Sequence, residues 1–494
     1  MIYAYIDKLV QKAKEAELIE AADVIYVRNQ VIQLFKLEAF PEESAVEKLS
    51  DDLSIHDVID WLVSYATDQA IIENLLDMKD IFAANLMNCF VARPSAVRET
   101  FYDKYKQAPT AATAYFYQLS KNSNYIQMNR IKNNISYKID TAYGVMDITI
   151  NLSKPEKDPE EIKRERAMKK DVHYPKCLLC KENEGYAGRI GHPARSNHRI
   201  IPIELAGETW NLQYSPYVYY NEHSIVFSDE HRDMKIDRQA FERLLHFTEK
   251  LPHYFIGSNA DLPIVGGSIL SHDHYQGGCY EFAMTRAEDS FQFPLNNFPD
   301  VTASVLKWPM SVIRLRGKSS IELVNAGELI LKSWRGYSDK AAHIHAFTEA
   351  VPHNTITPIA RVRNGSFELD LVLRNNRTTA EHPLGIFHPH ADVHHIKKEN
   401  IGLIEVMGLA VLPPRLKEEL GEITKLLLGK ENTVKDYHQQ WADDIVQEYG
   451  IISTVSEAEQ IVKKELGKKF VRVLEDAGVF KEKQSFQRFL DILN

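Results

Sequence analysis

The chain has 494 residues, of which 44% are hydrophobic, and a formal net charge of −10. This acidic balance excludes a global positive field for nucleic acid or an anionic membrane, so we expect neither as a partner. No run approaches the ~20 apolar residues of a membrane helix, and the first residues lack the apolar segment of a secretory signal. Four cysteines make no disulfide framework in so long a chain. We expect a cytoplasmic globular protein of about three domains.

The first part of the chain has helical periodicity. Apolar residues recur at three- and four-residue intervals, as at Ile2, Ile6 and Leu9. Ser54 is suited to cap the helix that follows it, and Pro94 and Pro109 are suited to turns between helices. The pattern predicts a helical N-terminal region over residues 1–135.

A charged connector is expected over residues 136–172. Between Lys154 and Asp171, thirteen of eighteen residues are charged, and two prolines oppose a regular helix at its start. A solvated linker is the ordinary interpretation, and an arm that binds a partner is the alternative.

After Cys177, short runs rich in Ile, Val, Tyr and Phe are typical of strands. The expected strands are HRIIPI, YSPYVYYNE, HSIVFSDEH, SIELVNAGELILKSW, SFELDLVLRNN and IGLIEVMGLAVL, with helices over residues 236–251 and near Ser338. We detect no internal repeat. The pattern predicts an α+β fold with an antiparallel sheet, divided into halves at 173–335 and 336–412 and followed by a helical tail at 413–494.

The most informative segment is GGSILSHDHYQGG, from Gly266 to Gly278. In a strand, His272, His274 and Gln276 share one face. Three nitrogen-bearing side chains beside glycine backbone form a suitable cradle for a phosphate. Surface or hydrogen-bonded histidines in an ordinary sheet are the alternative interpretation.

This segment resembles the active strand of the histidine-triad superfamily in its transferase form. The longer match, including the helical N-terminal region, is to the class II bacterial form of the galactose-1-phosphate uridylyltransferases. The commoner form has proline where Asp273 stands. The resemblance implies an antiparallel histidine-triad-like core, with the catalytic half at 173–335 and hexose binding in 336–412.

The resemblance also implies roles for single residues. His274 is the nucleophile that carries the uridylyl group, and Gln276 donates a hydrogen bond to the phosphoryl oxygens. A carboxamide cannot act as a base on water, so Gln276 should favour transfer over hydrolysis. The resemblance also implies that Asn259, Gly267 and Ser268 contact the uridine diphosphate. In the same way, Glu405 would accept hydrogen bonds from the sugar hydroxyls, and Lys398 would contact the phosphate of the hexose phosphate.

Two arginines, Arg195 and Arg199, stand near an expected strand start, where a guanidinium can grip phosphate. Surface salt bridges are an equally good interpretation of both. Four histidines lie close together late in the chain, at His388, His390, His394 and His395. They are compatible with a second metal site or with ordinary polar packing, and the sequence does not decide between the two.

Cys177 and Cys180 have the spacing with which two thiolates bind one tetrahedral zinc. By the resemblance, His231 and His272 complete the site, with His223 as a nearby competitor. Zinc would then be structural, holding His274 in place through His272. Reduced buried cysteines are the alternative. No redox cofactor is implied.

We expect transfer of a uridylyl group from UDP-glucose to galactose 1-phosphate through a covalent uridylyl-histidine. A nucleotide hydrolase or phosphorylase of the same superfamily is one alternative, which glutamine at position 276 argues against. A noncatalytic nucleotide-binding protein is the other. The sequence leaves the oligomeric state open, with a homodimer as one expectation.

Overall fold

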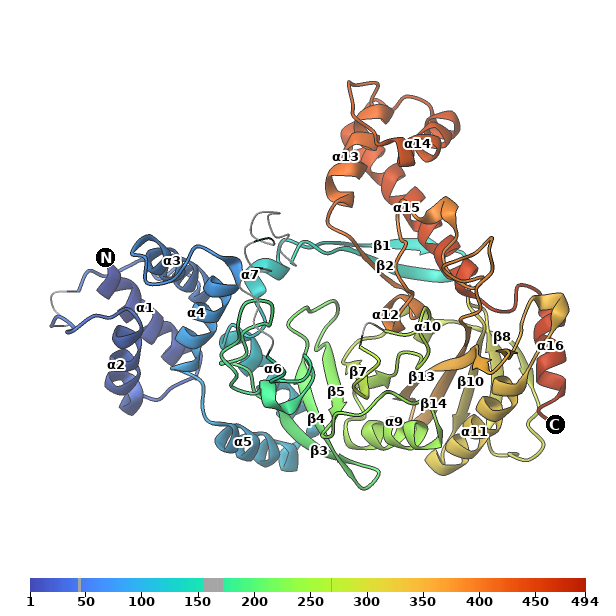
Figure 1. Cartoon of the computed structure of the whole chain (residues 1–494), viewed down its shortest axis with the longest axis horizontal. Helices are drawn as coiled ribbons and strands as arrows, with labels where there is room; N and C mark the ends of the chain where they lie inside the picture. The colour runs from blue at the N-terminus through green and yellow to red at the C-terminus, as the bar shows by residue number, and fades with distance from the viewer. Residues whose placement is uncertain (43–45, 154–162, 164–166, 168–171, 268) are drawn as a thin grey trace.

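The computed structural model describes residues 1–42, 46–153, 163, 167, 172–267 and 269–494. In Figure 1 the N-terminal helices lie at one end, a large sheet lies in the other half, and further helices stand above it. The charged stretch from Lys154 to Asp171 lies outside the described residues except at two positions. No helix in the described ranges is both long and apolar enough to cross a membrane.

The N-terminal region is helical, as its periodicity predicts. The Ser54 hydroxyl accepts the backbone N–H of Asp57 at 3.2 Å, and Pro94 and Pro109 each open a helix. The first four helices share a core around Leu9 and Leu62. The helices are α1 Ile2–Glu15, η1 Ala21–Asp23, α2 Val24–Leu34, α3 Ile55–Asp68, α4 Leu76–Asn88, α5 Pro94–Gln107, α6 Pro109–Asn122 and α7 Met128–Ile131.

The centre of the molecule is a ten-stranded sheet in which each neighbouring pair is antiparallel. Its spatial order is β3-β4-β5-β7-β6-β13-β14-β10-β9-β8. The strands are β3 Ile201–Leu205, β4 Glu208–Tyr214, β5 Ser224–Ser228, β6 Phe255–Gly257, β7 His274–Gly278, β8 Asp289–Phe293, β9 Thr302–Leu306, β10 Val312–Gly317, β13 Asn354–Arg363 and β14 Ser366–Asn375. The predicted α+β fold with an antiparallel sheet is confirmed.

The sheet contains an internal repeat that the sequence analysis did not detect. Strands β3, β4 and β5 are followed by helix α9 Arg238–Lys250 and then by β6 and β7. Strands β8, β9 and β10 are likewise followed by α11 Ser320–Gly336 and then by β13 and β14, in the same spatial order from the outer edge. The halves meet where β6 pairs with β13. Along the chain the two sets of strands divide between Gly278 and Asp289, and the expected domain boundary at residue 335 stays a prediction.

Several element predictions in this part were wrong. The segment SIELVNAGELILKSW lies in α11, because Ser319 caps it and the buried Leu323, Ala326 and Ile330 recur at helical spacing. Residues 215–222 of the expected strand YSPYVYYNE form turns before β5. Near Ser338 there is only the short η4 Lys340–Ala342, and IGLIEVMGLAVL divides into α12 Leu403–Val406 and β15 Leu409–Leu412.

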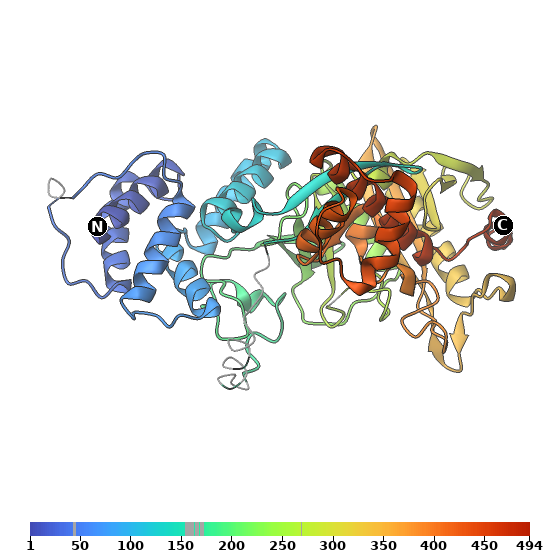
Figure 2. The same ribbon diagram turned by 90° about the horizontal axis from the view of Figure 1, so that it is seen from above.

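A second, three-stranded sheet joins the middle of the chain to its end. Strands β1 Ile135–Thr141 and β2 Gly144–Ile150 form a hairpin where the connector was expected to start, and β15 pairs parallel to β2. Helix α15 packs on β1, and Figure 2 shows the C-terminal helices over the sheet-containing part rather than over the N-terminal helices. The C-terminal helices are α13 Leu416–Leu427, α14 Asp436–Tyr449, α15 Val455–Ala477 and α16 Lys483–Asp491.

The remaining elements are short. They are η3 Lys181–Asn183, α10 Ala283–Arg286, η5 Ala391–Val393 and the two-residue strands β11 Phe347–Thr348 and β12 Val351–Pro352.

Candidate active site and metal cluster

Strand β7 presents His274 and Gln276 on one face, as the period of two predicts. The His274 Nδ1 lies 2.8 Å from the carbonyl oxygen of His272, so Nδ1–H donates and the lone pair stays at Nε2. Burial lowers the pKa of His274 to about 4. The ring is therefore a neutral imidazole with a free nucleophilic nitrogen.

His272 departs from the predicted arrangement because it precedes the strand. Its Nε2 lies 2.9 Å from the Ser228 carbonyl oxygen, and its Nδ1 lies 3.2 Å from the Cys177 sulfur. The side chain of His272 thus serves the cysteine pair, while its carbonyl fixes the ring of His274.

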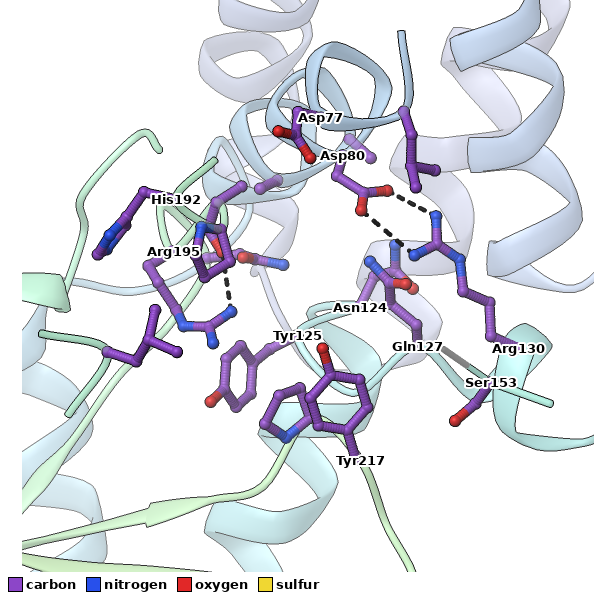
Figure 3. Close-up of a pocket in the computed structure, with 18 of the residues that line it drawn as sticks. Asp77, Asp80, Asn124, Tyr125, Gln127, Arg130, Ser153, His192, Arg195 and Tyr217 are labelled. Atoms are coloured by element: carbon purple, nitrogen blue, oxygen red, sulfur yellow. Dashed lines mark hydrogen bonds and ion pairs between the residues drawn. The ribbon is translucent and has the colours of Figure 1, made fainter. Parts of the chain in front are cut away.

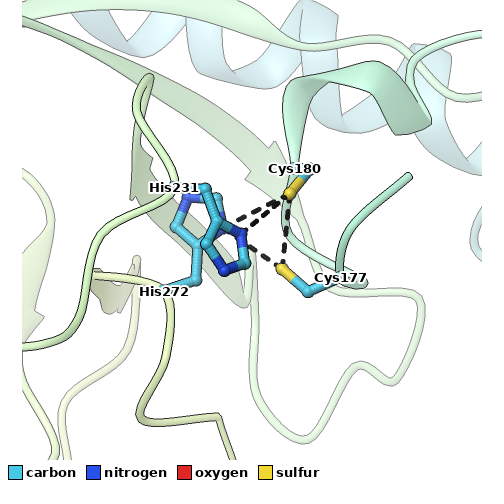
Figure 4. A group of neighbouring side chains, drawn as sticks. All are labelled: Cys177, Cys180, His231 and His272. Carbon is cyan, nitrogen blue, oxygen red and sulfur yellow. Dashed lines mark hydrogen bonds between the residues drawn. The ribbon is translucent and has the colours of Figure 1, made fainter. Parts of the chain in front are cut away.

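Cys177, Cys180, His231 and His272 form a tight cluster (Figure 4). The two sulfurs lie 3.6 Å apart, and the Cys180 sulfur lies 3.1 Å from the His231 Nδ1. Ligands around one tetrahedral zinc lie about 3.3–3.8 Å apart, as follows from metal–ligand bonds of about 2.0–2.3 Å. The four side chains therefore fit a metal ion, and His272 keeps its Nδ1 lone pair for it because Nε2–H donates elsewhere.

His223 does not belong to this cluster. Its Nδ1 lies 2.9 Å from the Tyr217 carbonyl oxygen, and its Nε2 lies 3.1 Å from the Gln276 carboxamide. The side chains that could hold a metal together therefore include His231 and not His223, and His231 as a ligand stays a prediction. The sequence analysis missed this contact with Gln276. The contact depends on the pairing of β5 with β7, in which Ile225 lies opposite Gln276.

Asp273 points to the opposite face of the strand. One oxygen of its carboxylate lies 3.5 Å from the Arg232 Nε and 3.8 Å from the Arg243 Nη1. On the same face, the Tyr275 hydroxyl lies 3.3 Å from the Arg243 Nη1. Through Arg243, these contacts connect Asp273 and Tyr275 to helix α9. His274 lies on the other face of the strand, together with Gln276.

A cleft of about 480 Å³ opens beside Gln276, within the usual range for a small-ligand site. Of the predicted substrate residues, Asn259, Gly267 and Glu405 line it together with Gln276. A side chain at Gly267 would lie 2.6 Å from the Asn259 amide nitrogen, so glycine keeps the wall open. Ser268 lies outside the described residues. Substrate contacts by this group stay predictions.

Lys398 is exposed and does not line the cleft, although it was expected to meet a phosphate. Its neighbour Lys397 is buried, and the Lys397 ammonium lies 2.9 Å from the Glu405 carboxylate. Burial alone would lower the pKa of Lys397, but the carboxylates of Glu405 and Glu399 together raise it. Sequence could not choose between two adjacent lysines, because burial in this irregular segment follows no period.

The two arginines have different surroundings. Arg199 is buried, and its guanidinium donates to the carbonyl oxygens of Ala92, Ser196 and His198, so it holds backbone rather than phosphate. Arg195 lines a second cleft of about 320 Å³, between α4 and residues 191–197 (Figure 3). Its guanidinium lies 5.4 Å from the centre of the Tyr125 ring. A phosphate contact by Arg195 stays a prediction.

The four late histidines form no metal cluster within the described ranges. Instead, His388 contacts the Pro389 carbonyl oxygen, His390 contacts that of Ile386, and His394 also contacts that of Pro389. His395 packs on the Trp441 ring. Polar packing is therefore the better of the two interpretations that the sequence left open.

Comparisons with known proteins match nearly the whole chain. Family models for the N-terminal and C-terminal domains of galactose-1-phosphate uridyl transferase match residues 17–233 and 247–443. A galactose-1-phosphate uridylyltransferase of Clostridium perfringens is 51% identical, with 99% of each chain covered, and one of Clostridium acetobutylicum is 51% identical with both chains fully covered.

Among solved structures, a yeast Ap4A phosphorylase covers 67% of this chain and 90% of its own. It is 14% identical with a TM-score of 0.35. The two family models and the full-length relatives show that this chain belongs to the galactose-1-phosphate uridylyltransferase family.

Proposed function

We propose that the chain transfers the uridylyl group of UDP-glucose to galactose 1-phosphate, giving glucose 1-phosphate and UDP-galactose. The observation that carries the proposal is the neutral, buried ring of His274, whose free Nε2 belongs to the strand face from which Gln276 lines a cleft. Family membership and the names of the full-length relatives support the same reaction.

Two displacements at one phosphorus account for the reaction. In the first, Nε2 of His274 bonds to the α-phosphorus of UDP-glucose, and the bond from that phosphorus to the bridging oxygen breaks, releasing glucose 1-phosphate. In the second, a phosphate oxygen of galactose 1-phosphate bonds to the same phosphorus, and the bond to Nε2 breaks. Both leaving groups depart without a strong general acid.

The surrounding residues would orient the reacting groups. Gln276 donates an amide hydrogen to a phosphoryl oxygen and offers no base for water. Asn259 and Gly267 shape the wall for the diphosphate, Glu405 accepts sugar hydroxyls, and Arg195 meets a phosphate of the nucleotide. The Asn259 Oδ1 also accepts the backbone N–H of Leu403 at 2.9 Å, which joins the two walls of the cleft.

Cys177, Cys180, His231 and His272 would hold a zinc ion. Bound there, zinc supplies a structural cross-link and no chemistry on the substrate. His272 contributes to catalysis by its carbonyl oxygen, which keeps the His274 tautomer. No other cofactor is needed by the two displacements. We place the enzyme in the cytoplasm, and a homodimer stays a prediction.

Radiolabelled UDP-glucose tests the reaction most directly. When UDP-glucose carries the label in its uridylyl group, the protein should retain about one label per chain on His274. Added galactose 1-phosphate should then release that label as UDP-galactose. His274→Ala should retain no label while binding UDP-glucose within about tenfold of wild type, since it removes bond formation more than ground-state contact. Turnover by this variant would rule out the assignment.

Steady-state kinetics separate this reaction from its alternatives. Double-reciprocal plots for the two substrates should be parallel, because glucose 1-phosphate leaves before galactose 1-phosphate enters. Intersecting lines would indicate direct transfer in a ternary complex. Release of UMP without any hexose phosphate would instead indicate a hydrolase.

A further inference from the structure

The contact between His223 and Gln276 has no role in the two displacements as written above. His223 is buried, and it immediately precedes strand β5. Its Nδ1 lies 2.9 Å from the Tyr217 carbonyl oxygen, and its Nε2 lies 3.1 Å from the atom assigned as the Gln276 Oε1. The Tyr220 ring packs on the imidazole with centres 4.4 Å apart. The imidazole of His223 is therefore held with Nδ1 at the Tyr217 carbonyl and Nε2 at the Gln276 carboxamide.

The hydrogen-bond partners of this ring require a definite tautomer. A backbone carbonyl oxygen only accepts, so the Nδ1 of His223 must carry a hydrogen. Burial lowers the pKa of His223 to about 4, so the ring holds one hydrogen near neutral pH. Its Nε2 then has a lone pair and can only accept.

This tautomer decides which end of the Gln276 carboxamide faces the ring. The two ends are nearly equal in size, and their hydrogen-bond partners determine the orientation. An oxygen facing Nε2 would set two lone pairs against each other. The amide nitrogen therefore faces His223, and one N–H donates to Nε2, which leaves the second N–H for another acceptor.

We propose that His223 is a positioning residue that accepts one amide hydrogen of Gln276 and thereby aims the second at the phosphoryl group beside His274. The inference rests on the proposed function, in which Gln276 donates to that group. Without His223, the carboxamide can turn its oxygen toward the phosphoryl oxygens and repel them. The contact with Tyr217 makes the orientation depend on the turn before β5.

The tautomer can be measured without any activity. In the full-length protein labelled with 15N-histidine, the His223 signals, assigned by their loss in His223→Gln, should show a protonated Nδ1 and an unprotonated Nε2 at pH 7. An Nε2–H tautomer or a doubly protonated ring would overturn the proposal, because either would place the oxygen of Gln276 against His223.

A double-mutant cycle tests whether His223 acts through Gln276. His223→Phe keeps a ring but removes the acceptor, and it should slow formation of the uridylyl-enzyme by about 10- to 100-fold, as losing or misplacing one donor does. The UDP-glucose concentration giving half the maximal rate should stay within about threefold. In a Gln276→Ala background, His223→Phe should cause no further loss.

Two matched variants complete the cycle. His223→Gln places an amide oxygen near the Nε2 position and should recover part of the rate. His246→Phe makes the same exchange on α9, where the imidazole accepts the Ala206 N–H, and should leave the rate unchanged.

Additive losses from His223→Phe and Gln276→Ala would overturn the inference, because they would show a structural role. If the wild type forms no uridylyl-enzyme, the proposed function fails instead, while the tautomer measurement still decides the orientation. The two failures are therefore distinguishable.

Discussion

The reactivity of His274 depends on two local features, a carbonyl acceptor at Nδ1 and burial of the ring. The sequence analysis could name His274 and Gln276, because a period of two places them on one face whatever the surrounding fold. It could not predict that His223 contacts Gln276, or that Lys397 rather than Lys398 reaches Glu405. The first contact depends on the pairing of β5 with β7, which brings distant parts of the sequence together, and the second depends on an irregular segment whose backbone direction no sequence period describes.

Gln276→His tests whether the carboxamide protects the uridylyl-enzyme from water. The imidazole adds a second histidine to the strand face of His274 and can act as a base near neutral pH. We expect weaker transfer and slow UMP release without hexose 1-phosphate, measured by product analysis. A variant that forms the adduct at the normal rate yet hydrolyses it no faster than wild type would show that Gln276 only positions phosphate.

Lys397→Met and Lys398→Met test the pairing beside the cleft. Lys397→Met removes the ammonium partner of the Glu405 carboxylate, and breaking a buried ion pair costs about 3–5 kcal/mol in comparable sites. We expect a lower free energy of unfolding in urea and a higher KM for galactose 1-phosphate. Lys398→Met should change the free energy of unfolding by less than about 0.5 kcal/mol and the KM by less than about twofold, as for other exposed positions. Equal effects of the two changes would contradict the assignment of Lys397.

Among the elements, the sequence predicted the strands around the active segment better than the helices of the second half. In β7 the alternation and the glycines agree with the strand that forms. In α11 the residues Ile321, Glu322 and Leu323 alternate between apolar and polar. Over the longer run, Leu323, Ala326 and Ile330 are buried at helical spacing, and the segment forms a helix. Short windows cannot separate the two periods, so the repeat of strands and helix stayed hidden.

Gly277→Ala tests how closely β7 must lie to its neighbours. A Cβ at Gly277 would lie 2.8 Å from the Phe255 carbonyl oxygen of β6, so backbone rather than a side chain must move. We expect destabilisation of about 1–3 kcal/mol, as in other overpacked sites. The adduct should form roughly a hundredfold more slowly, because a shift of about 1 Å suffices for such a loss. Urea unfolding and label incorporation measure the two effects.

Gly336→Ala is the matched control for this change. A Cβ there would meet nothing within 4 Å. Gly336 is the last residue of α11 and does not line the cleft. Alanine should be neutral or stabilising by up to about 1 kcal/mol, since it restricts the unfolded chain. A Gly277→Ala protein as stable and active as this control would show that β5, β6 and β7 have more room than their pairing indicates.

At the scale of the whole molecule, the proposed catalytic residues His274 and Gln276 both lie in one half of the repeated sheet. In the half built from β8 to β14, buried ion pairs take the interior positions, with the Arg314 Nε 2.6 Å from the Asp370 carboxylate and both side chains fully buried. The halves therefore share a topology but no sequence signal, which is why no repeat was detected. The cleft needs both, because Gln276 comes from β7 and Glu405 from α12 after the second half.

The metal cluster links three parts of the chain that are far apart in sequence. Cys177 and Cys180 precede the sheet, His231 follows β5, and His272 precedes β7. A bound ion stabilises only the folded arrangement, since the unfolded chain does not hold the four ligands together. Cysteine spacing predicted the first two ligands, and the other two required the family resemblance.

Cys177→Ser therefore tests the cluster through the stability of the whole chain. We expect about one zinc per chain in the wild type by elemental analysis, and loss of that ion in the variant. The thermal midpoint should fall by at least about 5 °C, since several kcal/mol of binding free energy no longer favour the folded state. Uridylyl-enzyme should form at least about tenfold more slowly, because His272 then no longer fixes the carbonyl that holds His274.

Cys89→Ser makes the same exchange in a thiol outside the cluster. The Cys89 sulfur lies 3.6 Å from the Asn85 carbonyl oxygen at the end of α4, a contact that a hydroxyl can also make. Its zinc content should equal that of the wild type, and its thermal midpoint should lie within about 2 °C, as for a change of less than about 0.5 kcal/mol. If Cys177→Ser keeps its ion, or loses no more stability than Cys89→Ser, the four side chains are reduced buried groups and the position of His274 depends on backbone contacts alone.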